Sequence, residues 1–306
     1  MAMAAPAFST NDALFATVQV ATLQAGAIRM PRGIRSVLIE IGCSDIETMD
    51  EEVLPQDTSS FLVAFEPLLD KYSTLAARGN SRINGNGATN MAVPLGFHHP
   101  RGVVLPLAVA PSASMVTFNV HRTAGCSSLL NVSQGGGWAP WCAQALEKRT
   151  VPAITLATAL ALARPSLPVK LLKIDVQGMD LRLIQATNRA NLSHVQAVSI
   201  ELAIDTPRCR GSRLVYADRE LCPAAIGYMA SIGFKYVGHA QPVASLQNST
   251  VASVQNGTSL QLVDAHRCPE NRGTTGWKCE IEAFFLNEAP RKGVARLTAA
   301  DIPLSN

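Results

Sequence analysis

The sequence has few aromatic and few charged residues. Of its 306 residues 5% are aromatic and 16% are charged, so a core must be built from Ala, Val, Leu and Ile. Lys and Arg number 26 against 23 Asp and Glu, a net charge of +3. So small an excess, without a basic run, argues against a nucleic-acid partner. Because 47% of the residues are hydrophobic, the composition excludes a disordered chain.

Long apolar runs and common ligand motifs are also missing. The longest apolar stretch, near Val151–Ala163, is interrupted by Pro152, so it falls short of the ~18–20 residues that a membrane span requires. No Cys-x-x-Cys pair is present, and His98-His99 has no further ligands at metal spacing, so no metal site is predicted. Met1–Pro6 lacks the positive start of a signal peptide.

Short apolar runs alternate with helical patterns along the chain. Strands are expected at Ser36–Gly42, Phe61–Phe65, Val103–Val109, Met115–Val120, Val169–Asp175, Val195–Leu202, Phe234–Val237 and Ile281–Leu286. Helices are expected at Asn11–Ala25, Pro67–Ala77, Leu181–Asn191 and Ala224–Ile232, the last ending at Gly233. This alternation predicts an α/β fold with a doubly wound, mostly parallel, seven-stranded sheet whose last strand is antiparallel. Met115–Val120 alternates like an antiparallel strand, and Pro106 favours an edge position or a bulge.

One domain with surface insertions fits this pattern better than two domains. We expect a helical N-terminal extension over residues 1–33, a main domain over 34–290 and a tail over 291–306. The main domain would carry a lid at about 121–150 and an insert at about 240–279.

Ligands of such a sheet bind beyond the carboxyl ends of its strands, at the switch point. Glu40-Ile-Gly-Cys-Ser-Asp45 follows the first strand, and Gly42 permits close approach to the backbone. Glu66 follows the second strand, where an acid can accept hydrogen bonds from both ribose hydroxyls. The chain has no Gly-x-Gly-x-x-Gly motif for a pyrophosphate, so a ribose ligand without phosphates, such as S-adenosylmethionine, is favoured. Alternatively, Glu66 only caps a surface helix.

Further candidates follow the later strands. Asp175 and Glu201 end neighbouring strands, where they could bind an ammonium group, orient a hydroxyl or act as a base; alternatively, each caps a helix or pairs with Lys173. His121 is a third candidate base, although a lone His is more often structural. Trp138 and Trp141 follow three glycines in the expected lid, where they would stack on an acceptor or simply pack the lid.

Four segments, taken together and in order, resemble the FkbM-type methyltransferase family. They are Val37-Leu-Ile-Glu-Ile-Gly-Cys-Ser-Asp45, Phe61-Leu-Val-Ala-Phe-Glu-Pro67, Val151–Leu160 and Leu171-Leu-Lys-Ile-Asp-Val-Gln-Gly178. The resemblance extends from about Ser36 to Gly238. It implies a Rossmann-like class I fold and methyl transfer from S-adenosylmethionine, typically to a hydroxyl of a sugar or polyketide-like acceptor.

The resemblance also assigns roles to residues. Glu40, Gly42 and Ser44 would line the methionine side of the cofactor, in the loop that also holds Cys43 and Asp45. Glu66 would hold the ribose, and Asp175 would lie near the cofactor or the acceptor.

The chain departs from the family pattern at three positions. Ile46 replaces a glycine, Ala157 an aspartate and Gln177 a glutamate. These departures keep open a catalytically silent binding protein of the same fold. An NAD-dependent oxidoreductase is a weaker alternative, because the later glycines are missing.

Seven cysteines leave an odd one. Cys209 and Cys222 lie 13 residues apart and Cys268 and Cys279 lie 11 apart, so two loop-closing disulfides would fit. Cys126 and Cys142 could pair across the lid or stay free. Four glycosylation sequons, at Asn131, Asn191, Asn248 and Asn256, agree with a secretory-pathway lumen, and the cytoplasm is the alternative. The oligomeric state is not predicted.

Overall fold

The structure is a computed structural model of the chain. It describes residues 21–44, 49–77, 82–83, 89–90, 95–96, 99–122, 124–132, 142, 145–163, 166–204, 216, 221–242, 260–263, 268 and 280–302. Among these residues, no helix combines the length and the apolar character that crossing a membrane would require.

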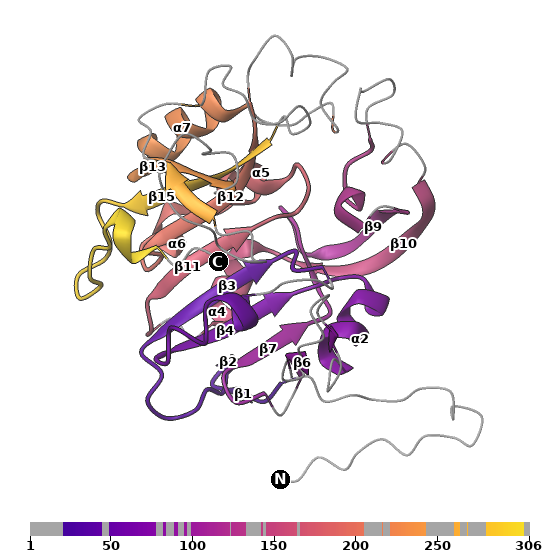
Figure 1. Ribbon diagram of the computed structural model, residues 1–306, viewed down its shortest axis with the longest axis horizontal. Helices are drawn as coiled ribbons and strands as arrows, with labels where there is room; N and C mark the ends of the chain where they lie inside the picture. Colours follow the sequence, from indigo (N-terminus) through magenta and orange to yellow (C-terminus); the bar gives the residue numbers. More distant parts are fainter. Residues whose placement is uncertain are drawn as a thin grey trace.

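A mixed sheet of eight strands forms the centre of the molecule (Figure 1). Its order is β14-β13-β15-β12-β11-β3-β4-β7. The strands span Ser36–Ile41 (β3), Ser60–Phe65 (β4), Gly102–Leu105 (β7), Val169–Ile174 (β11), Ala197–Ala203 (β12), Phe234–Pro242 (β13), Leu260–Val263 (β14) and Glu280–Asn287 (β15). Strands β7, β4, β3, β11 and β12 are parallel, whereas β15 is antiparallel to both of its neighbours.

This arrangement confirms an α/β fold with a mixed sheet whose last strand is antiparallel, although the sheet has eight strands where seven were predicted. The eighth strand, β14, was not predicted, because its sequence Leu-Gln-Leu-Val lies inside a long polar insert. It pairs with β13 at the edge of the sheet.

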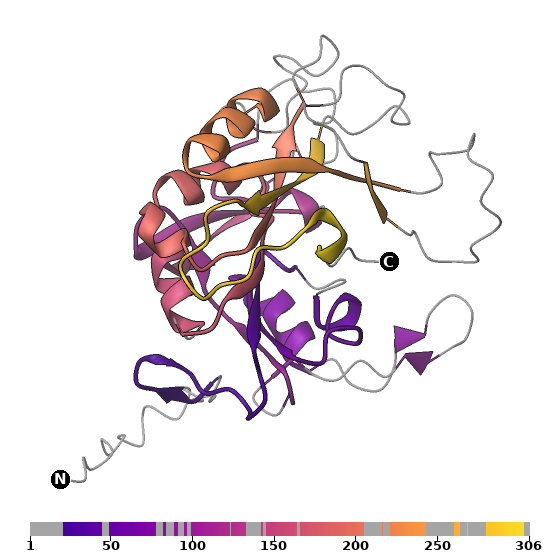
Figure 2. The ribbon, with the colours of Figure 1, turned by 90° about the vertical axis from the view of Figure 1, so that its left-hand side faces the viewer.

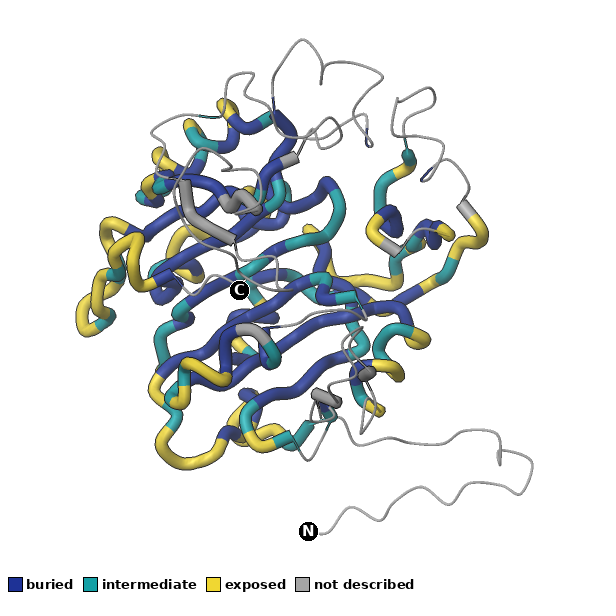
Figure 3. The backbone as a smooth tube through the Cα atoms, viewed as in Figure 1, coloured by how far each residue is buried: buried dark blue, intermediate teal, exposed yellow. Residues whose placement is uncertain are grey.

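Helices cover both faces of the sheet (Figure 2). On one face lie α4 (Leu156–Leu162), α5 (Asp180–Gln185), α6 (Arg189–Leu192) and α7 (Cys222–Ser231), and the opposite face carries α1 (Met49–Glu52), α2 (Leu69–Ala77) and the C-terminal segment with η4 (Ala299–Asp301). Every residue of β3 and β4 is buried, as Figure 3 shows by the dark blue strands. Burial on both faces explains why these strands are continuous apolar runs in the sequence.

A smaller sheet projects beside the central one. It contains β9 (Ser114–His121), β10 (Ala145–Ile154) and β8 (Ala108–Val109), with β9 antiparallel and β8 parallel to β10. We call β9, β10 and the chain between them the β9–β10 arm. The arm includes residues 145–150 of the expected lid, which belong to β10. One expectation is corrected, because Val103–Val109 is not one strand. The segment splits at Pro106 into β7, at the edge of the central sheet, and β8 in the smaller sheet.

Two short hairpins also differ from expectation. Leu23–Gln24 (β1) pairs with Ala27–Ile28 (β2) instead of ending a helix, because Ala25 and Gly26 both adopt positive φ, as a tight hairpin turn requires. Residues 11–20 of the expected helix lie outside the described residues. A second hairpin, for which no strands were predicted, pairs Arg82–Ile83 (β5) with Thr89–Asn90 (β6).

The expected helix Leu181–Asn191 is two short helices. Thr187 ends α5 by donating its hydroxyl to the Leu183 carbonyl at 2.7 Å. The side chain of Asn188 then accepts the Ala190 N–H at 2.9 Å and caps α6. Short polar side chains therefore interrupt an otherwise helical apolar pattern.

One disulfide is an alternative that the sequence left open, and the other differs from the local pairs suggested by spacing. Cys126 bonds to Cys142, and Cys222 bonds to Cys268 instead of to the nearer Cys209. Cys43 is a buried free thiol. Cys209 and Cys279 lie outside the described residues.

Candidate active site

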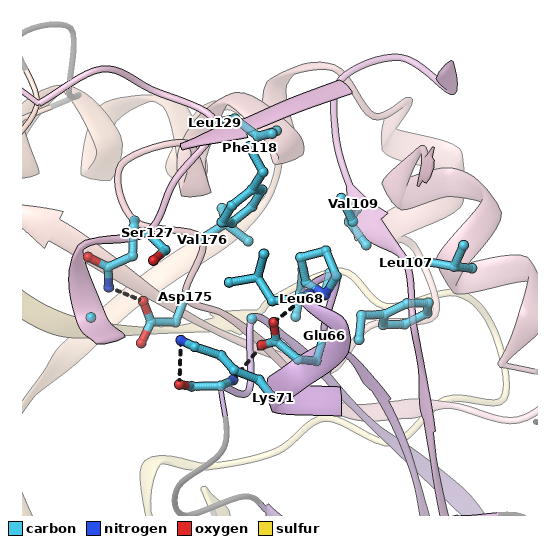
Figure 4. Close-up of a pocket in the computed structure, with 18 residues that line it drawn as sticks. Glu66, Leu68, Lys71, Leu107, Val109, Phe118, Ser127, Leu129, Asp175 and Val176 are labelled. Carbon is cyan, nitrogen blue, oxygen red and sulfur yellow. Dashed lines mark hydrogen bonds between the residues drawn. The ribbon is translucent and has the colours of Figure 1, made fainter. Parts of the chain in front are cut away.

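A pocket opens beyond the carboxyl ends of β3, β4 and β11 (Figure 4). It encloses about 760 Å³ of empty space, including open solvent at its mouth, and is lined by Ile41, Gly42, Ser44, Phe65, Glu66, Pro67, Leu68, Lys71, Leu107, Ala108, Val109, Phe118, Gly125, Ser127, Leu129, Asp175, Val176 and Gln177. From β3 the chain proceeds outward to β4 and β7 and then returns to β11. The pocket therefore occupies the predicted switch point.

Gly42 brings two neighbouring strand ends together. Its N–H donates to the Phe65 carbonyl at 3.0 Å, and the N–H of Asp175 donates to the Ile41 carbonyl at 2.9 Å. Gly42 has φ +83°, and an added Cβ would lie 1.9 Å from the backbone oxygen of Asp175. Glycine is thus required by a neighbouring strand end, in addition to any ligand.

Glu66 holds a fixed carboxylate at the bottom of the pocket. One oxygen accepts the Ser44 N–H at 2.8 Å and the other accepts the Leu68 N–H at 2.9 Å. The ammonium of Lys71 donates to the Ser44 hydroxyl at 2.9 Å. Because backbone donors bind both oxygens, the Glu66 carboxylate is held at the pocket. The helix-cap alternative therefore describes only part of its contacts.

Asp175 forms the other polar end of the pocket. The amide Nε2 of Gln177 lies 2.7 Å from Oδ1 of Asp175 and 3.4 Å from Oε2 of Glu201. Burial and then the charge of Glu201 raise the pKa of Asp175 to about 6, although Lys173 and Gln177 act in the opposite direction. An acid with this pKa is mostly ionised at neutral pH and can accept a proton.

The outer wall of the pocket comes from the start of the chain between β9 and β10. Gly125 and Ser127 line the pocket on either side of Cys126, which is the end of η1 (Ala124–Cys126) and is crosslinked to Cys142. The hydroxyl of buried Tyr216 donates to the Cys126 carbonyl at 2.9 Å. These contacts fix the wall against the rest of the domain.

Glu40 and Cys43 lie next to the pocket and do not line it. Glu40 is buried and accepts the Met49 N–H at the start of α1 at 2.9 Å and the Lys173 ammonium at 3.2 Å. The thiol of Cys43 donates to the Phe65 carbonyl at 3.6 Å. Burial, then the charges of Glu40 and Glu66, raise the pKa of Cys43, so its sulfur stays protonated at neutral pH.

The remaining predicted site residues are spread out. Glu201 does not line the pocket but accepts a hydrogen bond from Gln177, which does. His121, a candidate base, is the buried last residue of β9; its N–H donates to the Ser127 hydroxyl at 3.1 Å, and it does not line the pocket. Asp45, Trp138 and Trp141 lie outside the described residues. Within the described part of the chain, no cluster of three His, Cys, Asp or Glu side chains could hold a metal.

Several lining residues were not predicted. Leu68 and Lys71 lie one helical turn apart near the start of α2. Because Glu66 was predicted just before this helix, helical spacing could have identified both residues as neighbours of the pocket. No local sequence signal identifies Phe118, Ser127 and Leu129, because the folding of the arm brings them to the pocket. All three appear at the left of Figure 4, facing Asp175 and Val176.

The sequence profile of the Methyltransferase FkbM domain matches residues 48–236, more than half of the chain. The chain belongs to the FkbM methyltransferase family. The matched region includes β4, β7, β11 and β12, and it begins after β3 and Gly42. No curated protein and no solved structure gave a significant match.

Membership supports a methyltransferase and implies a class I methyltransferase fold. It gives no support to the NAD-dependent oxidoreductase or to the catalytically silent alternative. The observed α/β architecture with a mixed sheet agrees with this class.

Proposed function

We propose that the protein is an S-adenosylmethionine-dependent O-methyltransferase of class I, with a Rossmann-like fold. The main support is the position of Glu66 at the end of β4, on the floor of a mostly apolar pocket at the switch point. A buried carboxylate beside apolar walls suits a ribose joined to an uncharged base. When bound, the cofactor would supply a methyl group made electrophilic by its sulfonium.

The residues of this chain would bind and orient the reactants. Glu66 would accept hydrogen bonds from the ribose hydroxyls, and Gly42 and Ser44 would lie along the cofactor. Leu68, Val109 and the neighbouring apolar side chains would exclude water. Glu40 and Cys43 would support the loop from behind. In-line displacement depends mainly on such alignment of the two reactants.

Asp175 would act as the base. It would take the hydroxyl proton of the acceptor during methyl transfer. The cofactor, when bound, would supply the methyl group, and its sulfur would keep the electron pair of the broken carbon–sulfur bond. The pKa of about 6 keeps Asp175 ionised before the step and basic enough to take the proton. Glu201 stays a neighbouring charge, and His121 is a weaker candidate because it does not line the pocket.

The acceptor is a hydroxyl on a sugar, glycan or polyketide-like small molecule, as the family relationship suggests. Trp138 and Trp141 would contact it from the lid. The near-neutral composition fits such an acceptor better than a nucleic acid.

Calorimetry with S-adenosylmethionine, its demethylated product and NAD tests the proposal. The first two should bind and NAD should not. Mass spectrometry of hydroxylated acceptors should then show a methyl gain. Absence of binding by both sulfur ligands would reject the proposal, and binding without turnover on any acceptor would favour a silent binding protein.

We also propose that the protein works in the secretory-pathway lumen. Two disulfides and the exposed sequon residues Asn131 and Asn191 support this compartment. The sequons at Asn248 and Asn256 lie outside the described residues. Intact mass after alkylation, with and without reductant, tests the disulfides: equal masses would mean that none is present.

A further inference from the structure

Gln177 stands between two carboxylates from neighbouring strands. Its amide nitrogen is 2.7 Å from Asp175 Oδ1 and 3.4 Å from Glu201 Oε2. An amide NH₂ group has two protons, so it can donate to both acids at once. A glutamate at this position would instead place a third negative charge between them.

The backbone of Gln177 is fixed as firmly as its side chain. It adopts φ +57°, which residues other than glycine rarely do. Its carbonyl accepts the hydroxyl of Ser128 at 2.8 Å, which ties it to the segment that forms the pocket wall. Gln177 therefore joins the end of β11, the end of β12 and the arm.

Negative charges dominate around Asp175. Glu201 on β12 lies opposite Glu282 on β15 in the sheet register, and both raise the pKa of Asp175, after burial as the largest cause. Lys173 acts in the opposite direction and also binds Glu40 on β3. Glu66 and Lys71 face Asp175 from the other polar end of the pocket.

We propose that Gln177 and Glu201 are positioning residues for Asp175: Gln177 holds the carboxylate beside the pocket, and Glu201 places a negative charge on the other side of the same amide. The catalytic meaning of this assignment rests on the proposed function, whereas the electrostatic coupling of the three side chains can be measured without any reaction.

The two residues act on Asp175 with opposite signs. Removing the charge of Glu201 with Glu201→Gln lowers the titration midpoint of Asp175, because a like charge disfavours ionisation. Removing the donor with Gln177→Met raises the midpoint, because the ionised carboxylate loses a hydrogen bond. Gln177→Glu raises it further by adding a charge. Shifts of about one pH unit are expected for close neighbours of this kind.

The test is a titration of the protein carrying ¹³C-labelled Asp carboxyl carbons, followed by NMR. Asp175→Asn identifies the resonance by its loss. Glu282→Gln should lower the midpoint less than Glu201→Gln, since it is the weaker of the two neighbouring charges. Glu288→Gln, an exposed residue just beyond β15, should leave the midpoint unchanged. Thermal unfolding of each variant confirms that it is folded, and Gln177→Met serves if Gln177→Glu does not fold.

Opposite shifts for Glu201→Gln and Gln177→Met support the proposal. Shifts of the same sign, or no shifts, overturn it. If methyl transfer is found, the acid limb of kcat/KM against pH must move with the NMR midpoint in each variant, and a limb that stays fixed also overturns the assignment. If the midpoints move as expected but no cofactor binds, the coupling stands and the proposed function fails.

Discussion

The backbone oxygen of Asp175 lies where a side chain at position 42 would begin. An added Cβ on Gly42 would approach it to 1.9 Å, a distance that no relaxed structure allows. Two residues of the candidate site thus determine each other's positions through the backbone alone. The Asp175 carboxylate, the proposed base, is positioned by the packing of β3 against β11.

Gly42→Ala should therefore destabilise the protein more than its backbone angle alone explains. Gly26→Ala is the matched control, because Gly26 has φ +80° and nothing within 4 Å of an added Cβ. The control should cost about 1–2 kcal/mol, the penalty for a left-handed Ala. Denaturant unfolding measures both, and equal losses would show that the contact with Asp175 does not constrain the site.

Glu66→Ala should weaken the binding of S-adenosylmethionine by roughly 1–3 kcal/mol, the range for hydrogen bonds to a charged group. Calorimetry measures the change. Asp70→Ala is the control, because its carboxylate pairs with Arg149 at 2.5 Å and does not line the pocket. An unchanged affinity for Glu66→Ala would remove Glu66 from the cofactor site.

Asp57 should contribute to stability only above acidic pH. Burial alone would raise its pKa, but hydrogen bonds from Lys170 at 2.8 Å and Ser60 at 2.7 Å outweigh it and lower the pKa to about 2. A carboxyl with a lowered folded-state pKa stabilises the protein above its unfolded pKa, near 4, and this contribution is lost as the pH falls towards 2. Asp57→Asn should cost about 1 kcal/mol at pH 7, after allowance for solvent screening.

Unfolding measured at several pH values tests this prediction. The cost of Asp57→Asn should shrink between pH 4 and pH 2. Asp70→Asn, which breaks an exposed pair, should change stability little at any of these pH values. A cost of Asp57→Asn that does not depend on pH would contradict the assignment.

The two disulfides among the described residues should differ in their effects. Loss of Cys222–Cys268 should reduce stability more, and loss of Cys126–Cys142 should weaken ligand binding more. Their sequence separations are 16 and 46 residues, so chain entropy predicts losses of about 3 kcal/mol for Cys126→Ser/Cys142→Ser and about 4 kcal/mol for Cys222→Ser/Cys268→Ser. Only the first bond contains a cysteine, Cys126, that lies between the pocket-lining residues Gly125 and Ser127. Calorimetry should therefore show weaker ligand binding in the first double variant alone. Equal effects on binding would mean that the wall does not depend on its crosslink.

The sequence predicted those site residues whose positions follow from a strand and its end. Glu66 and Asp175 were found because each follows a buried apolar run. Gly42 was found as well, but its contact with Asp175 comes from a strand far away in the chain. The structure therefore adds a neighbouring backbone contact to the ligand contact that spacing predicts.

Residues placed by long-range folding were missed. Ser127 and Phe118 reach the pocket because Asn119 pairs with Ser128 and Ser128 bonds to Gln177, 49 residues away. No local pattern encodes such contacts. The partner of Cys222 was missed for the same reason, since spacing alone does not fix disulfide connectivity.

The order of the strands also bears on how the chain folds during synthesis. β15 lies between β12 and β13 although it follows both in the sequence. When β13 has been synthesised, the strand that lies between β13 and β12 does not yet exist. The edge of β12 therefore stays open to incorrect pairing until Glu280–Asn287 (β15) emerges. The Cys222–Cys268 bond can form before that strand is made, because both cysteines precede it. This bond would hold the segment that contains β13 close to the start of α7 before β15 has been added to the sheet.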